Sequence, residues 1–117
     1  MPEKNRTDLH FIEDILGAIE KIERYVGDMD FESFDANDMA KDAIIRNFEV
    51  IGEAARNISD EMRNRYPFAE WKEMTSFRNV LIHGYFGLSA ETIWDTVKKN
   101  LAPLKAHLLE IKKSETL

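Results

Sequence analysis

The chain has 117 residues, which is enough for one helical domain and too few for two. It is 44% hydrophobic and 32% charged, as expected of a globular protein in water, and it contains no cysteine for a disulfide, a thiolate nucleophile or a metal site. No apolar run approaches the roughly 20 residues that a bilayer-spanning helix needs, and the polar N-terminus lacks the apolar core of a signal peptide. We therefore expect a cytoplasmic protein with one domain over residues 1–117.

The net charge of −6 is unevenly distributed along the chain. Residues 1–38 hold eleven acidic and four basic residues, whereas residues 39–117 hold eleven acidic and twelve basic residues. The second part could present a locally positive surface that binds a phosphate backbone. The basic residues that could form it are Arg56, Arg63, Arg65, Lys72 and Arg78. Ordinary solvated helix faces are the alternative interpretation.

The first predicted helix begins at an N-cap residue, Thr7 or Asp8, and ends at Gly27. Its apolar residues recur at intervals of three and four, which is typical of a helix with one buried face. These residues are Leu9, Ile12, Ile15, Leu16, Ile19, Ile22 and Val26.

An acidic loop is predicted next, over residues 28–36, with Phe31 and Phe34 pinning it to the core. A second helix is predicted to begin near Asn37 or Asp38. Its apolar positions follow the three- and four-residue spacing used in antiparallel bundles. These positions are Ile44, Phe48, Ile51, Ala55 and Ile58.

Ser59, followed by two acidic residues, is predicted to cap a short helix that ends at Tyr66. Pro67 is predicted to open a third main helix, and Ser89 to cap a fourth. No segment alternates with the period of two that marks a strand. The predicted fold is therefore all-α, an up-and-down bundle of four main helices with a short extra helix.

Residues 78–87, at the end of the third predicted helix, place an arginine, an amide, an imidazole and a phenol close together. On an unbroken helix Arg78 and His83 would lie about 140° apart, on different faces. Gly84 allows the chain to leave the helix directly after His83. We therefore expect Arg78, His83 and Tyr85 to surround one helix end.

These residue types suit cleavage of a phosphodiester. The imidazole of His83 can take and give a proton near neutral pH, and the guanidinium of Arg78 can bind a phosphate and stabilise its transition-state charge. The pair could cleave RNA without a metal, with activation of the ribose 2′-hydroxyl and formation of a 2′,3′-cyclic phosphate. Asn79 could orient either group, and a symmetric dimer would supply both an acid and a base.

A simpler interpretation makes His83 a helix cap and Arg78 a surface ion-pair partner. Metal binding is not expected, because no histidine or carboxylate lies three or four residues from His83. No glycine-rich phosphate loop is present, and we expect no cofactor.

The run over residues 71–86 resembles the signature of HepT-like proteins of the HEPN superfamily. Its arginine, four residues, histidine, one residue and tyrosine are present without gaps as Arg78, His83 and Tyr85. The resemblance continues upstream over residues 44–55 and downstream over residues 93–101, so it covers most of the chain in order.

The resemblance implies the toxin of a type VII toxin–antitoxin pair: a helical homodimer that is a metal-independent endoribonuclease. Arg78 and His83 would be catalytic and would face each other in the dimer cleft, with RNA as the substrate. The implied partner is an MntA-type nucleotidyltransferase that neutralises the toxin by AMPylation of Tyr85. Each AMP would add a phosphate charge beside Arg78, where an RNA phosphate would bind.

Two other functions remain open at this stage. The chain could be a non-catalytic helical subunit that binds the nucleotidyltransferase and holds a nucleotide through Arg78, or a dimeric interaction module without activity. Phe48, Gly52, Trp71 and Phe77 are candidates for a helix–helix interface between subunits.

Overall fold

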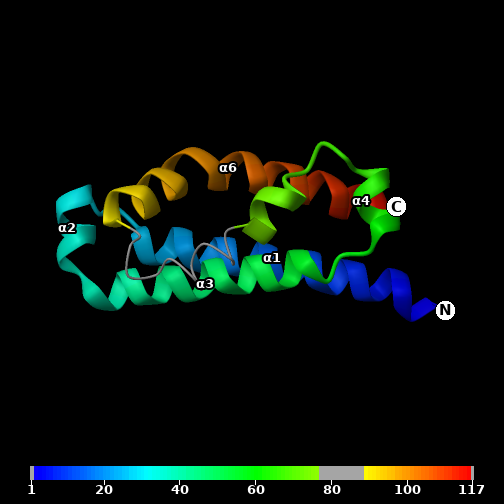
Figure 1. Ribbon diagram of the computed structural model, residues 1–117, viewed down its shortest axis with the longest axis horizontal. Helices are drawn as coiled ribbons and strands as arrows, with labels where there is room; N and C mark the ends of the chain where they lie inside the picture. Colours follow the sequence, from blue (N-terminus) through cyan, green and yellow to red (C-terminus); the bar gives the residue numbers. More distant parts are fainter. Residues whose placement is uncertain (1, 77–88, 117) are drawn as a thin grey trace.

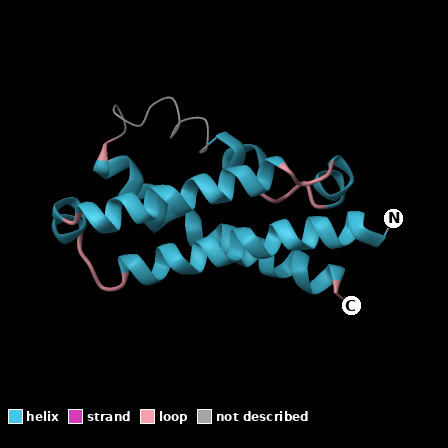
Figure 2. Ribbon diagram, turned by 90° about the horizontal axis from the view of Figure 1, so that it is seen from below, coloured by secondary structure: helices cyan, strands magenta, loops and turns pink. Residues whose placement is uncertain are grey.

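The computed structural model describes residues 2–76 and 89–116, with side chains from Asp8 onward. In this part of the chain, helices are joined by short loops and no strand occurs (Figure 2). The named helices are α1 (Pro2–Val26), α2 (Phe31–Ala36), α3 (Asp38–Arg56), α4 (Asp60–Arg65) and α6 (Ala90–Glu115). Residues 71–76 are also helical. The predicted all-α fold is confirmed.

The long helices α1, α3 and α6 lie along the length of the molecule, which measures 47 × 29 × 21 Å (Figure 1). α1 and α3 run in opposite directions side by side, and α6 runs lengthwise against α1 (Figure 1). α2 covers one end of this arrangement and α4 the other. This antiparallel start agrees with the predicted up-and-down bundle, and the return from α4 to α6 includes residues outside the described part of the chain.

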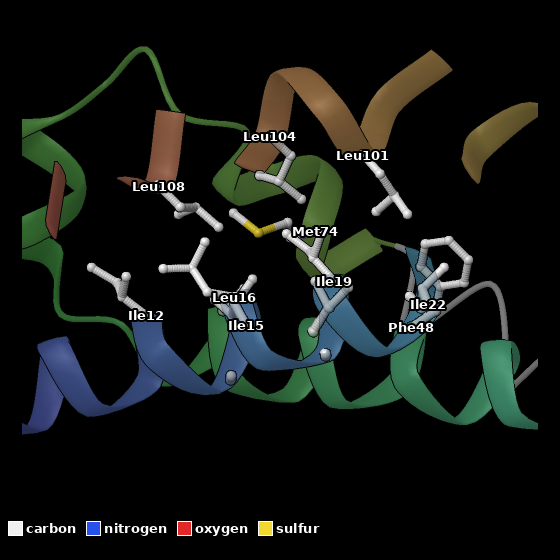
Figure 3. Close-up of a cluster of buried hydrophobic side chains, with 14 of the residues drawn as sticks. Ile12, Ile15, Leu16, Ile19, Ile22, Phe48, Met74, Leu101, Leu104 and Leu108 are labelled. Atoms are coloured by element: carbon white, nitrogen blue, oxygen red, sulfur yellow. The ribbon is translucent and has the colours of Figure 1, made fainter. Parts of the chain in front are cut away.

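The core lies between α1, α3 and α6 and is almost entirely apolar (Figure 3). Ile15 and Ile19 of α1 are fully buried and face Leu104 and Leu108 of α6, with Met74 between the helices. Burying each such side chain contributes about 1.5–3 kcal/mol before the entropy cost of ordering it. The three- and four-residue spacing read from the sequence is therefore the spacing of the buried face.

The predicted start of the first helix is wrong, because α1 begins at Pro2 rather than after Thr7 or Asp8. Proline is favourable at a first helical position, where its missing N–H would have no partner in any case. Asp8 lies inside α1, is 5% exposed and binds Ser59, the N-cap residue of α4. Its carboxylate accepts hydrogen bonds from the backbone N–H of Ser59 at 2.9 Å and from the Ser59 hydroxyl at 2.7 Å.

The acidic connection also differs from the prediction, because it contains α2. Asp30 caps this helix by accepting a hydrogen bond from the backbone N–H of Ser33, and that bond lowers the pKa of Asp30. Phe34 is fully buried and Phe31 packs against the core, so the predicted role of these two rings is confirmed. The bundle therefore has a second short helix that the sequence pattern did not reveal.

The third main helix starts later than predicted. Residues 67–70 form a turn, and the helix begins at Trp71 rather than at Pro67. The carbonyl of Tyr66 accepts hydrogen bonds from the backbone N–H of Ala69 and from the Trp71 indole, which closes this turn. Phe68 consequently lies on the surface.

The predicted end of α1 and the predicted caps of α3, α4 and α6 are confirmed, whereas the predicted end of the third main helix at His83 lies outside the described residues. Gly27 ends α1 with a positive φ of 49°, a conformation that glycine adopts without strain. Asn37, Ser59 and Ser89 cap α3, α4 and α6 through side-chain oxygens that accept backbone N–H groups. None of the helices in the described residues is sufficiently long and apolar to span a membrane.

Three of the four residues proposed for an interface between subunits are buried within the single chain. Phe48 is 3% exposed and Trp71 is 5% exposed, and Gly52 is buried as well. None of these three presents a surface to a second subunit. Phe77, the fourth candidate, lies outside the described residues.

Candidate functional site

The predicted site residues Arg78, Asn79, His83 and Tyr85 lie in residues 77–88, outside the described residues. Their roles and mutual geometry therefore stay predictions. The structure describes the helical residues directly before this segment and the helix directly after it, and these two flanks are firmly built into the bundle.

The upstream flank is residues 71–76. The indole Nε1 of Trp71 donates a hydrogen bond to the carbonyl of Tyr66 at 2.9 Å. Met74, one turn further, is 1% exposed in the middle of the core, and the Thr75 hydroxyl donates to the carbonyl of Trp71 at 3.1 Å. These contacts fix the helix that leads toward Arg78.

The downstream flank is the first turn of α6. The Ser89 hydroxyl accepts a hydrogen bond from the backbone N–H of Thr92 at 3.1 Å, which satisfies a free helical donor. One turn later the Trp94 ring packs at a tilt against the buried ring of Phe34, with centroids 5.1 Å apart, and edge-to-face against Phe31 at 6.2 Å. The ammonium of Lys98 lies 4.7 Å from the centre of the Trp94 ring, a favourable cation–π distance.

Two of the basic residues expected to bind phosphate have internal partners instead. Arg63 donates hydrogen bonds to the carbonyls of Ala55 and Ile58, at 2.6 Å and 3.3 Å, and so caps the end of α3. Arg65 donates to both carboxylate oxygens of Glu115 at 2.9 Å and to Glu61 at 2.8 Å.

Both of these acidic groups raise the pKa of Arg65, Glu115 more than Glu61. A guanidinium that is held by two carboxylates contributes little positive potential to a passing phosphate. Of the five basic residues expected to form a positive surface, Arg56 and Lys72 are exposed, and Arg78 lies outside the described residues.

Tyr66 completes this joint between α4 and α6. Its hydroxyl donates a hydrogen bond to Glu115, which raises the pKa of Tyr66 above the usual value for a phenol. The same bond, together with the one from Arg65, lowers the pKa of Glu115 although its partial burial opposes the shift. Glu115 thus stays ionised at a helix C-terminus, where the helix dipole alone would disfavour a negative charge.

The histidines outside the motif have ordinary surroundings. His10 is exposed, with its ring nitrogen 3.4 Å from a carboxylate oxygen of Asp14. His107 is partly buried, and its Nδ1 lies 2.6 Å from a carboxylate oxygen of Glu70, across 37 positions in the sequence. No sequence pattern indicated this second contact. Among the described residues, no group of three or more acidic, histidine or cysteine side chains is arranged to hold a metal ion.

Comparison with known proteins places this chain in a family. Residues 15–111 match the family described as "Ribonuclease HepT-like", a stretch that includes the whole of residues 77–88. The chain is 37% identical over 108 residues to a Thermococcus cleftensis protein named "Probable ribonuclease HepT", covering 92% of this chain and 98% of that protein.

Further relatives agree with this assignment. A protein of Methanocaldococcus jannaschii named "Putative RNase" is 39% identical over 95 residues, covering 81% of this chain and 87% of its own length. A "Putative RNase" of Caldanaerobacter subterraneus is 34% identical over 110 residues, covering 94% of this chain and 98% of that protein. No solved structure matches the chain. The resemblance stated from the sequence is confirmed, and the chain belongs to the HepT-like family of ribonucleases.

Proposed function

We propose that this chain is a metal-independent endoribonuclease that acts as the toxin of a type VII toxin–antitoxin pair in the cytoplasm. Residues 1–117 would form one HepT-like domain that works as a homodimer. The observation that carries this proposal is the family match over residues 15–111, because the matched stretch contains the arginine and histidine needed for RNA cleavage.

The chemistry assigns a role to each motif residue. The imidazole of His83 takes the proton from a ribose 2′-hydroxyl, and that oxygen attacks the adjacent phosphorus. The bond from phosphorus to the 5′-oxygen of the next nucleotide breaks, and His83 of the partner subunit donates a proton to that oxygen. Arg78 stabilises the negative charge on the phosphoryl oxygens, and Asn79 orients the imidazole or the phosphate. The products are a 2′,3′-cyclic phosphate and a free 5′-hydroxyl.

Regulation would act on the same site. An MntA-type nucleotidyltransferase transfers AMP from ATP to the hydroxyl of Tyr85, with release of pyrophosphate. The added phosphodiester brings a negative charge and a bulky nucleotide two residues from His83, so it competes with RNA for Arg78. Intact-mass measurement after incubation with such an enzyme and ATP tests this step. Tyr85→Phe should gain no AMP.

An RNA cleavage assay in the presence of EDTA tests the ribonuclease. The wild-type chain should cut a single-stranded RNA and leave cyclic phosphate ends. His83→Ala and Arg78→Ala should each lose at least about 99% of the rate, because the first removes a general acid–base group and the second removes the group that stabilises the transition-state charge. The matched control is His10→Ala, which removes an exposed histidine from α1 and should retain full activity.

Three results would count against the proposal. EDTA could abolish cleavage, His83→Ala could cleave as fast as wild type, or sedimentation could show an active monomer. A chain that never cleaves RNA but binds a nucleotide through Arg78 would instead identify the non-catalytic partner subunit.

A further inference from the structure

The outer face of α6 carries apolar side chains that are open to solvent. Ala102, Pro103, Ala106 and Leu109 are all exposed, and Leu109 retains 47% of its accessible surface. The buried leucines of α6 alternate with these residues at helical spacing, so the exposed ones lie on the side of α6 opposite the core. α6 itself runs along one long side of the bundle (Figure 1).

The other two long helices present charged side chains to solvent. Within residues 13–24 of α1 and residues 42–56 of α3, every exposed residue is charged. Within residues 101–109 of α6, by contrast, every exposed residue is apolar. Apolar side chains that gather on one exposed face indicate a contact with another molecule, whereas single ones do not.

The exposed residues of α6 follow the spacing of a coiled-coil contact. They recur at alternating intervals of four and three residues, and we call this set the α6 seam: Asp95, Lys99, Ala102, Ala106, Leu109 and Lys113. A second helix with the same spacing can pack against such a seam along its length. The α6 seam has an apolar middle, a negative charge toward its N-terminal end and a positive charge at its C-terminal end.

The charges at the two ends of the seam match those of a second, antiparallel copy. In that orientation Asp95 of each copy lies opposite Lys113 of the other, which gives two ion pairs of opposite sign. A parallel copy would instead bring each of these charges against its own kind. Among the described residues, neither Asp95 nor Lys113 has an ion-pair partner within its own chain. A helix of another protein with a single sign of charge would match one end of the seam and repel the other.

The same antiparallel register suits the middle of the seam. Ala102 of one copy lies opposite Ala106 of the other, and these small side chains allow the two helices to approach closely. Lys99 lies opposite Leu109 of the other copy, where the methylene groups of the lysine can cover the leucine while its ammonium reaches water.

Two lysines on the flank of the seam already have acidic partners. The Nζ atom of Lys105 lies 2.9 Å from a carboxylate oxygen of Glu23, and that of Lys112 lies 3.3 Å from a carboxylate oxygen of Glu13. Both glutamates belong to α1 of the same chain. These lysines therefore add little repulsion between two antiparallel α6 helices.

We propose that two copies of this chain pack against each other through the α6 seam, with their α6 helices antiparallel. Two ion pairs between Asp95 and Lys113 enclose an apolar contact made by Ala102, Ala106 and Leu109. The contact involves described residues alone and does not depend on the ribonuclease activity. Together with the dimer cleft of the proposed function, it joins chains into an assembly larger than a dimer.

The test is cysteine cross-linking in the full chain, which has no cysteine of its own. Under mild oxidation, a mixture of Ala102→Cys and Ala106→Cys should form disulfides between copies at least about tenfold faster than either variant alone. The reason is that the register places residue 102 opposite residue 106, whereas identical positions are offset by four residues, about 6 Å along the helix. The control mixture combines Ala102→Cys with Asn64→Cys, at an exposed position of α4, and should cross-link no faster than the single variants.

A charge swap tests the ion pairs in the same mixture. Asp95→Lys in both cysteine variants should slow cross-linking at least about threefold, and so should Lys113→Asp, because each change creates two like-charge pairs. The combination Asp95→Lys/Lys113→Asp should restore the original rate. Asp28→Lys changes the net charge by the same amount as Asp95→Lys at an exposed position outside α6 and should have no effect.

Circular dichroism melts verify that each variant is folded. The proposal is wrong if the mixture of Ala102→Cys and Ala106→Cys cross-links no faster than the single variants. It is equally wrong if the swapped pair fails to restore the rate, or if Asp28→Lys slows cross-linking as much as Asp95→Lys.

Discussion

The middle of the bundle and its α4 end are held together by different physical forces. In the middle, α1 and α6 meet through isoleucine and leucine side chains that are fully buried and have no polar partner to satisfy. At the α4 end, Ile58 and Met62 are also buried in the apolar core, but hydrogen bonds and ion pairs in addition join distant segments, between Asp8 and Ser59 and between Glu115 and both Arg65 and Tyr66.

This difference decides how each region responds to change. Apolar burial has no preferred direction and does not depend on pH. The middle of the bundle should therefore lose stability when a buried side chain is replaced by a smaller one, to the same extent at every pH. A hydrogen bond or ion pair depends on the direction and charge of each group. The stability of the α4 end should therefore change when one of its bonded groups gains or loses a proton.

The largest effect is expected for Ile19→Ala, which removes a fully buried side chain between α1 and α6. The unfolding free energy measured with urea should fall by about 2–5 kcal/mol, because the cavity adds to the lost burial. The decrease should be the same at neutral and mildly acidic pH. Leu109→Ala, at a 47% exposed position of α6, is the control and should change stability far less. Equal losses for both variants would refute the assignment of this core.

The next effect is expected for Asp8→Ala at the α4 end. The variant leaves the backbone N–H and the hydroxyl of Ser59 without their partner, and a buried donor left unpaired costs about 1–3 kcal/mol. Urea unfolding measures the loss. Asp14→Ala, two turns further along the same helix and exposed, should cost less than Asp8→Ala. Should the two aspartates prove equivalent, the hydrogen bonds from Ser59 to Asp8 would not stabilise the α4 end.

The same contrast explains what could be predicted from the sequence. The buried face of each long helix and the caps Asn37, Ser59 and Ser89 depend on residues within four positions of one another, so local patterns predicted them. The bond from Asp8 to Ser59 spans 51 positions and that from Tyr66 to Glu115 spans 49, and no local pattern encodes either. The short α2 was missed because six residues are too few to show a helical period.

The candidate site shows the same difference between local patterns, which the sequence reveals, and long-range contacts, which it does not. Its residue types and spacing, Arg78 and His83 before Gly84, are local and could be recognised from the sequence, and they led to the family. Whether a second subunit brings its own pair into one cleft depends on contacts between chains, which no spacing within one chain specifies. The dimer cleft therefore stays a prediction.

A pH-dependent effect of about 1 kcal/mol is expected for Glu115→Gln. The folded state lowers the pKa of Glu115, so its contribution is present above the unfolded pKa and is lost as pH falls through the folded one. The folded state raises the pKa of Tyr66, so the contribution of Tyr66 to stability is lost as pH rises through its pKa in the folded state. Urea unfolding across the pH range should show wild-type stability decreasing at both ends. Glu115→Gln should flatten the curve, and the exposed Glu110→Gln should not.

The smallest effect is expected for Gly17→Ala, on the outer face of the otherwise apolar middle of α1. The new methyl group meets nothing within 4 Å, so it neither fills the core nor creates a clash. Alanine loses less backbone entropy than glycine in a helix, and the unfolding free energy should rise by about 0.5–1 kcal/mol. Since no titrating group is involved, the gain should be identical at every pH, unlike that of any substitution at the α4 joint. A loss of stability would mean that the outer face of α1 at Gly17 is not open in the folded protein, so that the new methyl group meets a neighbour after all.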